Sequence, residues 1–180
     1  MAVLAIRTFG DPALRQRAAE VARVTDLHRR IIEDMFETMR DAPGVGLAGP
    51  QIGVMERIFV WEVDERSGAV INPVIVSRSE ETDSAEEGCL SLPGIYYPVT
   101  RSARVTVEGL DASGEPVSLE ADELLARVCQ HEIDHLDGVL FVDHLSDEQR
   151  KEALARLREQ ALGLTPSTAE ASRHPTEETL

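Results

Sequence analysis

The residues best suited to chemistry lie in the segment Gln130-His131-Glu132-Ile133-Asp134-His135. Two histidines four residues apart on a helix project from the same face, so His131 and His135 can both reach one metal ion. Glu132 follows the first histidine and is placed to contact water bound to that ion. This H-E-x-x-H pattern is typical of zinc hydrolases, where a carboxylate beside two imidazole ligands moves protons. For this segment alone, the alternative is an exposed helix that carries two histidines by chance.

The helix positions in line with these histidines strengthen the interpretation of a catalytic metal site. One face of the expected helix contains Leu124, Val128, His131 and His135, which follow the spacing i, i+4, i+7 and i+11. These residues form one stripe that is apolar at its start and metal-binding at its end, as we expect for the wall of a substrate pocket. Cys129 lies beside the stripe, and we interpret it as a core residue, because a lone cysteine in apolar surroundings usually packs there.

A third metal ligand is needed, because catalytic zinc sites commonly combine three protein ligands with a water molecule. The histidines downstream of His135 are His144, just before the expected third helix, and His174, in the polar tail. Neither is well placed, although a downstream carboxylate such as Glu148 stays an alternative. The third ligand is therefore better sought upstream.

Cys89, in the segment Glu87-Gly88-Cys89-Leu90-Ser91, is the upstream candidate. A thiolate is a strong ligand for Zn²⁺ or Fe²⁺, and binding keeps it deprotonated. Gly88 lets the backbone pass close to a ligand or a substrate. A simple place in the core is the alternative for Cys89, and a disulfide with Cys129 stays open.

Three segments together resemble the peptide deformylase family. They are Gly44-Val45-Gly46-Leu47-Ala48-Gly49-Pro50-Gln51, Glu87-Gly88-Cys89-Leu90-Ser91 and Gln130-His131-Glu132-Ile133-Asp134-His135-Leu136. They occur in the order and at the approximate spacing of the family, and the match extends over most of residues 1–150. The second and third segments match the family pattern fully, whereas Gly49 stands in the first where alanine is commoner.

The resemblance implies a role for each matching residue. The metal ligands would be Cys89, His131 and His135. Glu132 would be the general base and acid, and the Gln51 side-chain amide and the Leu90 backbone N–H would form an oxyanion hole. Val45, Leu124 and Val128 would line a pocket for a methionine side chain, and backbone groups of Gly46 and Gly88 would pair with the peptide.

The resemblance also implies a substrate and a cofactor. The substrate would be the N-formyl-methionyl end of a nascent peptide, from which the enzyme would release formate. The cofactor would be one divalent metal ion, with Fe²⁺ preferred and Zn²⁺, Ni²⁺ or Co²⁺ tolerated. Arg127 occupies a position that is often apolar in the family, a departure at the rim of the pocket and not at its floor.

Two other functions stay open from the sequence. A general metallopeptidase would use a carboxylate or a third histidine as ligand, and it would remain active without Cys89. A metal-stabilised interaction module, or a deformylase relative without activity, would need no catalytic groups. The presence of Glu132 and Gln51 argues against this second function, since a purely structural site requires neither.

Two charged features have more than one interpretation. Asp134 either supports a histidine, pairs with Arg101 or is simply solvated. The expected third helix resembles the C-terminal helix that some deformylases use near the ribosome. It carries Arg150, Lys151, Arg156 and Arg158 among several acidic residues. This mixed charge favours a solvated surface helix over transient ribosome association.

Composition narrows the class of protein. The chain has 180 residues, of which 42% are hydrophobic, as expected for a globular domain. Its net charge of −15 argues against direct nucleic-acid binding, which relies on clustered Lys and Arg. No apolar stretch approaches the roughly 20 residues of a membrane helix, and the N-terminal apolar run is too short for a signal peptide. We therefore expect a cytoplasmic protein without membrane contact.

The elements that must position these residues follow from periodicity and turn signals. Helices are expected at residues 26–40, 121–136 and 146–162, and strands at 57–63, 69–76, 104–110 and 117–120, the last two joined by a turn at 111–114. A Gly-rich loop is expected at 44–53. The order predicts an α+β fold with mostly antiparallel sheets around a central metal-binding helix. Residues 1–162 would form one catalytic domain, and 163–180 a disordered polar tail.

Overall fold

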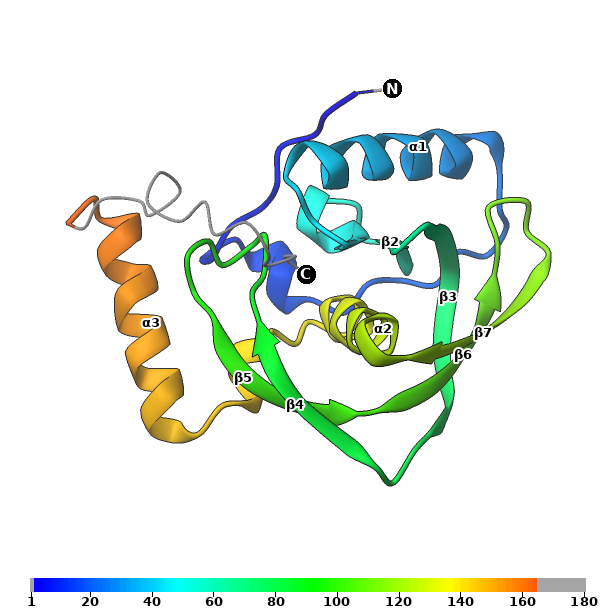
Figure 1. Ribbon diagram of the computed structural model, residues 1–180. Coiled ribbons are helices and arrows are strands. Elements are labelled where there is room, and N and C mark those ends of the chain that lie inside the picture. Colours follow the sequence, from blue (N-terminus) through cyan, green and yellow to red (C-terminus); the bar gives the residue numbers. More distant parts are fainter. Residues whose placement is uncertain (1, 165–180) are drawn as a thin grey trace.

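The computed structural model describes residues 2–164, which adopt an α+β fold (Figure 1). Its α-helices are α1 (Asp26–Asp41), α2 (Glu123–Leu136) and α3 (Asp147–Ala161). Its strands are β1 (Gly46–Ala48), β2 (Ile58–Val63), β3 (Arg66–Arg78), β4 (Thr82–Glu87), β5 (Tyr97–Ser102), β6 (Arg104–Leu110) and β7 (Pro116–Asp122). Short 3-10 helices cover Pro12–Arg15, Gly49–Ile52 and Phe141–His144. The expected fold class is thus confirmed.

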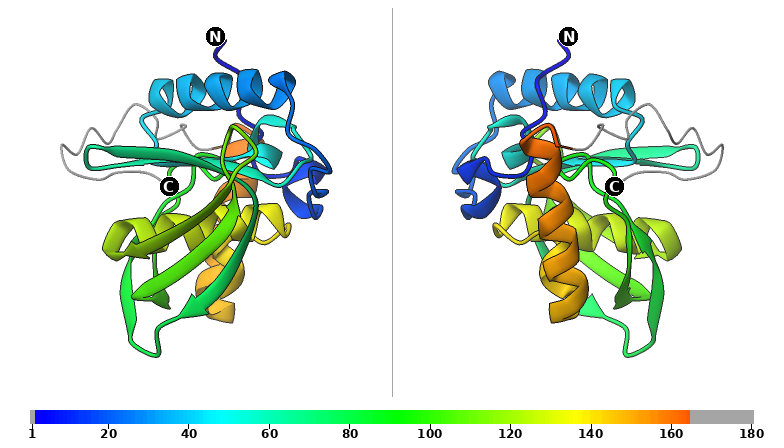
Figure 2. Two further views of the ribbon diagram at one scale, coloured as in Figure 1. Left: turned by 90° about the vertical axis from the view of Figure 1, so that its right-hand side faces the viewer. Right: turned by 90° about the vertical axis from the view of Figure 1, so that its left-hand side faces the viewer.

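The described strands form two antiparallel sheets, one of five strands in the order β1-β2-β3-β6-β7 and one formed by β4 and β5. Side chains alternate along β2, as the pleat of a strand requires. Phe59 and Trp61 pack in the cluster that contains α2, whereas Ile58 and Val60 pack in the cluster that contains α1. The strands therefore separate the two helices, with α1 above the β2–β3 hairpin and α2 below it (Figure 2).

Helix α2 is the centre of the molecule, seen end-on in Figure 1. It packs against both sheets, and it is buried on nearly all sides. Gly138 follows the end of the helix at Leu136, and its φ of +75° suits a glycine in this position. A Cβ there would meet the Arg15 backbone at 2.9 Å. This close packing fixes the end of the helix that carries His135.

Most expected elements are confirmed, with three corrections. Ala121 and Asp122 belong to β7, where they pair with Val105 and Arg104 of β6, so the second helix begins two residues later than expected. The Gly-rich segment 44–53 is not only a loop, because it contains β1 and a 3-10 helix. Strands β4 and β5 were not predicted, since most β4 side chains are polar and exposed, which removes the apolar alternation that identifies a strand.

Helix α3 begins where the sequence predicts, with the Ser146 side chain accepting a hydrogen bond from the Gln149 backbone N–H. Ala153 and Leu157 are buried in a cluster that also contains Cys89, so one face of α3 belongs to the core. The boundary between a domain at 1–162 and a tail at 163–180 stays a prediction, and residues 165–180 lie outside the described part. Within residues 2–164, no helix combines the length and the apolar character that crossing a membrane requires.

Candidate metal centre

The structure brings Cys89 together with His131 and His135. Cys89 follows β4, and both histidines lie on α2. The three side chains are buried, and one candidate ligand atom from each lies within 4.8 Å of the others. Cys89 Sγ is 3.2 Å from His135 Nε2. Both cysteines are free, so the alternative of a Cys89–Cys129 disulfide is wrong, and Cys129 packs in the core as expected.

The chemistry of these donors fits a divalent transition-metal ion. His131 Nδ1 lies 3.1 Å from Glu87 Oε2, and His131 Nε2 is buried with no hydrogen-bond partner among the described residues. Burial holds the pKa of His135 well below its ordinary value, which favours the neutral imidazole that binds metals. Burial also raises the pKa of the Cys89 thiol, so a thiolate there needs a compensating positive charge.

Glu132 lies beside these residues, fully buried. Neither of its carboxylate oxygens has a hydrogen-bond partner in the described part of the chain. Burial raises the pKa of Glu132 well above its ordinary value, and the charges of Glu87 and Asp134 act in the same direction. A carboxyl group whose pKa is raised in this way holds a proton more readily than an exposed carboxylate does, which suits a group that accepts and donates protons.

Gln51 lies in the 3-10 helix after β1, and its amide group is held from both ends. Its Oε1 accepts a hydrogen bond of 2.7 Å from the Ala48 N–H. Its Nε2 donates to Ser91 Oγ at 3.3 Å and lies 3.8 Å from Cys89 Sγ. The amide N–H groups therefore point toward the segment that contains Cys89 and the half-buried Leu90.

A buried charge network supports His131 from behind. Glu87 is fully buried, and its Oε1 accepts hydrogen bonds from Arg101 Nε at 2.9 Å and Arg127 Nη1 at 2.7 Å. Its Oε2 accepts a bond of 3.0 Å from Arg101 Nη2. Burial alone would raise the pKa of Glu87, but hydrogen bonds from His131 and Arg101 outweigh it and hold the pKa below its usual range. Glu87 therefore stays ionised.

Sequence reasoning assigned no function to Glu87, although it starts one of the matching segments. A hydrophobic pattern does not reveal such a residue, because its partners come from other elements. Asp134 extends the network, accepting from Arg101 Nη1 at 2.6 Å and lying 2.7 Å from His144 Nε2. The expectation that Asp134 pairs with Arg101 is confirmed, and the alternative of a simply solvated charge is wrong. Within the described residues, His144 belongs to this network and not to the group of candidate ligands.

The residues expected to bind substrate lie around the first half of α2. Val45, Val128 and the half-buried Leu124 pack in one apolar cluster. Gly46 lies over Glu132, and a Cβ there would be 2.4 Å from Glu132 Oε1. Gly88 is covered by a tyrosine ring, since its Cβ would be 2.3 Å from Tyr96 Cε1.

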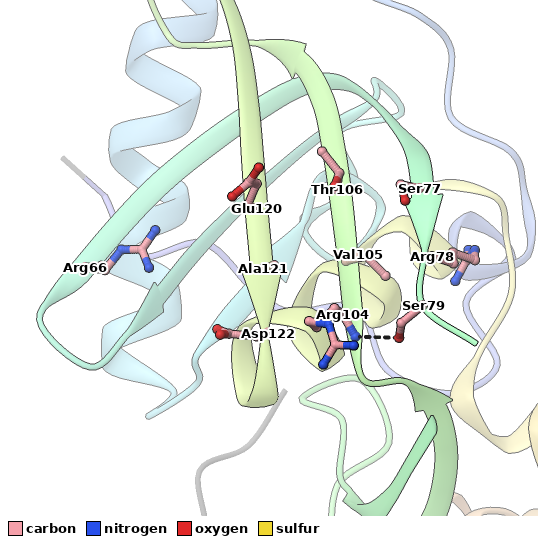
Figure 3. Close-up of a pocket in the computed structure, with 10 residues that line it drawn as sticks. All are labelled: Arg66, Ser77, Arg78, Ser79, Arg104, Val105, Thr106, Glu120, Ala121 and Asp122. Carbon is pink, nitrogen blue, oxygen red and sulfur yellow. Dashed lines mark hydrogen bonds between the residues drawn. The ribbon is translucent and has the colours of Figure 1, made fainter. Parts of the chain in front are cut away.

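Two hollows lie near these elements. One, of about 580 Å³, borders the first turn of α2, and its mostly polar lining includes Leu124 and Arg127. Arg127 is buried there, and its guanidinium is held by the charge network. The other, of about 540 Å³, lies over β3, β6 and β7 and is lined mainly by polar residues such as Arg104 and Glu120 (Figure 3). The predicted site residues do not line this second hollow.

Comparisons with known proteins point in one direction. The sequence model of the family described as polypeptide deformylase matches residues 3–151. The chain is 51% identical to the peptide deformylase of Acidothermus cellulolyticus, across 98% of this chain and 97% of that protein. It is 46% identical to peptide deformylase 1 of Corynebacterium glutamicum, across 89% of this chain and 98% of that protein.

Solved structures give the same result. The fold is similar to the crystal structure of peptide deformylase from Ehrlichia chaffeensis, with a TM-score of 0.86 and 37% identity over 90% of this chain and 98% of that chain. It is also similar to that of peptide deformylase from Thermus thermophilus, with a TM-score of 0.83 and 46% identity over 89% and 96% of the two chains.

Proposed function

This chain belongs to the polypeptide deformylase family, whose members are metal-dependent hydrolases, and we propose that it removes the formyl group from the N-terminal formyl-methionine of nascent polypeptides. The products would be formate and a free N-terminal amine. The observation that carries the proposal is the close approach of Cys89, His131 and His135, next to a Glu132 carboxylate that has no hydrogen-bond partner among the described residues.

Cys89 Sγ and the imidazoles of His131 and His135 would hold one divalent ion. Fe²⁺ is the proposed ion, and a site with one sulfur and two nitrogen donors would also accept Zn²⁺, Co²⁺ or Ni²⁺. The bound ion would supply a nucleophile at neutral pH by lowering the pKa of water, and it would polarise the formyl oxygen. Metal analysis of protein purified without oxygen tests the choice of ion.

Glu132 would move the proton. Its raised pKa suits a group that accepts a proton from the attacking water and then donates it to the leaving nitrogen. Its burial keeps bulk water from competing for the same proton. The proposal requires a carboxylate without a fixed hydrogen-bond partner, and the absence of such a partner for both Glu132 oxygens among the described residues supports it.

The Gln51 amide and the Leu90 backbone N–H would stabilise the negative charge that develops on the formyl oxygen. Such donors act best when they are fixed before the reaction, because they then need no reorganisation. The hydrogen bond from Ala48 to Gln51 Oε1 supports this role, since it orients the amide N–H groups toward the Cys89 segment.

Two strand edges could hold the peptide. Among the described residues, β1 pairs only with β2, and β4 pairs only with β5. Each strand therefore has one edge without a strand partner, where a peptide would add as an extended strand. Gly46 in β1 and Gly88 after β4 would pair with the substrate backbone, and Val45, Leu124 and Val128 would contact the methionine side chain.

Formate release from formyl-methionyl peptides, measured without oxygen, tests the proposed function. We expect the wild-type protein to release formate and one free amine for each peptide. The variant Glu132→Gln should keep the metal and lose most activity, whereas Cys89→Ala should lose both. Cleavage of internal peptide bonds that persists in Cys89→Ala would instead identify a general metallopeptidase.

A cytoplasmic location and transient ribosome contact through α3 are further proposals. Truncation after Leu145 would be a poor test of ribosome contact, because it removes Ala153 and Leu157 from the core. The charge reversals Lys151→Glu and Arg158→Glu avoid this problem, since both side chains are exposed. Co-sedimentation with ribosomes that is unaffected by these reversals would exclude a charge-driven contact through α3.

A further inference from the structure

We propose that Arg127 is a positioning residue for the metal centre, which acts by fixing Glu87 and, through Glu87, the ring of His131. The inference rests on the proposed function only in taking His131 as a metal ligand. Arg127 and His131 lie on the same helix, α2, but the Arg127 side chain points toward the two-stranded sheet. Arg127 contacts strands β4 and β5, whereas His131 faces the candidate metal site.

The contacts of Arg127 hold its guanidinium rigidly. The residue is 5% exposed. Its Nη1 donates to Glu87 Oε1 at 2.7 Å and to the Val99 carbonyl at 2.8 Å. Its Nη2 donates to the carbonyl and to Oδ2 of Asp83, both at 3.1 Å. A planar guanidinium with this many acceptors has few alternative orientations, so it can fix the carboxylate that it contacts.

Glu87 transmits this restraint to His131. Arg101 binds both oxygens of Glu87, and Arg127 adds a second cation on Oε1. The other oxygen, Oε2, faces His131 Nδ1 at 3.1 Å. An ionised carboxylate accepts from the Nδ1–H, which leaves Nε2 as the nitrogen with a free lone pair. Rotation of the Glu87 carboxylate would disturb both the tautomer and the angle of the ring.

Arg101 alone would hold Glu87 less firmly, because Arg101 is shared. Its Nη1 donates to Asp134 Oδ2 at 2.6 Å. Glu87 thus receives two arginines, and each arginine also binds a second carboxylate: Arg101 binds Asp134, and Arg127 binds the exposed Asp83. Asp134 also has His144 Nε2 at 2.7 Å. Without Arg127, Glu87 would keep only Arg101, which it shares with Asp134, and part of the buried Glu87 charge would lose its partner beside Glu132. A buried charge that loses its partner is costly, so we expect Glu87 to shift.

The alternative is that Arg127 only joins α2 to β4 and β5. Arg57 provides a matched control for this alternative. It is also buried and ion-paired, with Nη1 donating to Asp137 Oδ1 at 2.7 Å and to the Leu136 carbonyl at 3.3 Å. Within residues 2–164, its side-chain hydrogen bonds reach neither Glu87 nor His131. Removing either arginine should lower the free energy of unfolding, but only Arg127 should change the metal centre.

The test compares Arg127→Met, Arg127→Lys and Arg57→Met as full-length, Co²⁺-substituted proteins. The measurements are the Co²⁺ absorption spectrum, the Kd for Co²⁺, kcat and KM for a formyl-methionyl peptide, and the free energy of unfolding. We expect Arg127→Met to weaken Co²⁺ binding by about 10- to 100-fold, to change the spectrum and to lower kcat with little change in KM. Arg127→Lys should recover part of the loss, because an ammonium group keeps the charge beside Glu87. Arg57→Met should keep the wild-type spectrum and Kd.

The outcomes separate the inference from the proposed function. If Arg127→Met loses stability like Arg57→Met but keeps the wild-type spectrum and Kd, Arg127 is a structural link and the inference is wrong. If the wild-type protein binds Co²⁺ but releases no formate, the proposed function fails, while a weaker Kd in Arg127→Met still supports the inference. A wild-type protein that binds no Co²⁺ overturns both. Should Arg127→Met not fold, Arg127→Gln replaces it with the same expectations.

Discussion

Replacement of Gly46 by alanine would place a methyl group against the carboxylate that we propose as general base. An ideal Cβ at this position lies 2.4 Å from Glu132 Oε1 and 2.9 Å from Val128 Cγ1. Ordinary contacts begin near 3.4 Å, so the carboxylate or β1 must move by about 1 Å. Val128 is fully buried, which leaves little room on that side.

The expected magnitude follows from this displacement. Overpacking of a well-filled core typically costs about 1–3 kcal/mol of unfolding free energy. A catalytic group that moves by about 1 Å can lose roughly 100-fold in rate. We therefore expect Gly46→Ala to fold, to retain its metal and to lose about 100-fold in kcat. The metal should remain, because the three atoms nearest to the added methyl group belong to Glu132 and Val128 and not to a candidate ligand.

Formate release under steady-state conditions, together with metal content and urea unfolding, measures these effects. Gly68→Ala is a matched control, because both glycines pair with Trp61 and a Cβ at Gly68 would meet the Trp61 ring at 2.9 Å. It should cost stability without a comparable loss of kcat. The reasoning would be refuted by wild-type kcat in Gly46→Ala, or by equal losses in the two variants.

Two further predictions concern residues near the candidate ligands, and a third concerns the stability of the fold. Gln51→Leu should lower kcat by about 100- to 1000-fold with unchanged metal content, and unchanged activity would exclude the oxyanion role. Asp134→Asn should weaken binding of the proposed Fe²⁺ by about 10-fold, because the Asp134 carboxylate helps to fix the Arg101 guanidinium that binds Glu87, and an unchanged affinity would remove Asp134 from the support of the metal centre. Burial alone would raise the pKa of Asp143, but the hydrogen bond from Arg15 outweighs it and holds that pKa below its usual range. Asp143 therefore stabilises the fold above about pH 3.9, and its contribution is lost as the pH falls through its lower folded-state pKa. Between about pH 5 and pH 3, the free energy of unfolding should fall more steeply with decreasing pH in the wild type than in Asp143→Asn. Equal pH dependence in the two proteins would contradict this.

The sequence could predict the features that depend on local geometry. The spacing of His131 and His135 places both on one helix face without any knowledge of the fold. The approach of Cys89 to His135 is different, because these residues are 46 positions apart. Ligand chemistry made Cys89 a candidate, and the resemblance to a family was needed to favour it over a place in the core. Ser146 illustrates the local case again, since its side chain caps α3 as a cap residue should.

Elements that depend on tertiary contacts could not be predicted in this way. Strand β4 consists mainly of exposed polar residues, and its partner β5 supplies the hydrogen bonds that define it. The network around Glu87 is equally hidden, because Arg101 and Arg127 lie 14 and 40 residues away and on different elements. Buried charges of this kind follow no hydrophobic period, so only the folded arrangement identifies their partners.

The two sheets contribute in different ways to the site on α2. The five-stranded sheet brings Gly46 to Glu132, and its edge strand β1 leaves room above that carboxylate only because residue 46 has no side chain. The two-stranded sheet brings Glu87 to His131 and ends next to Cys89. The proposed general base and the candidate ligands His131 and Cys89 are therefore contacted by different sheets. This arrangement explains why a change at Gly46 should affect kcat and spare the metal, whereas a change at Arg127 should affect the metal first.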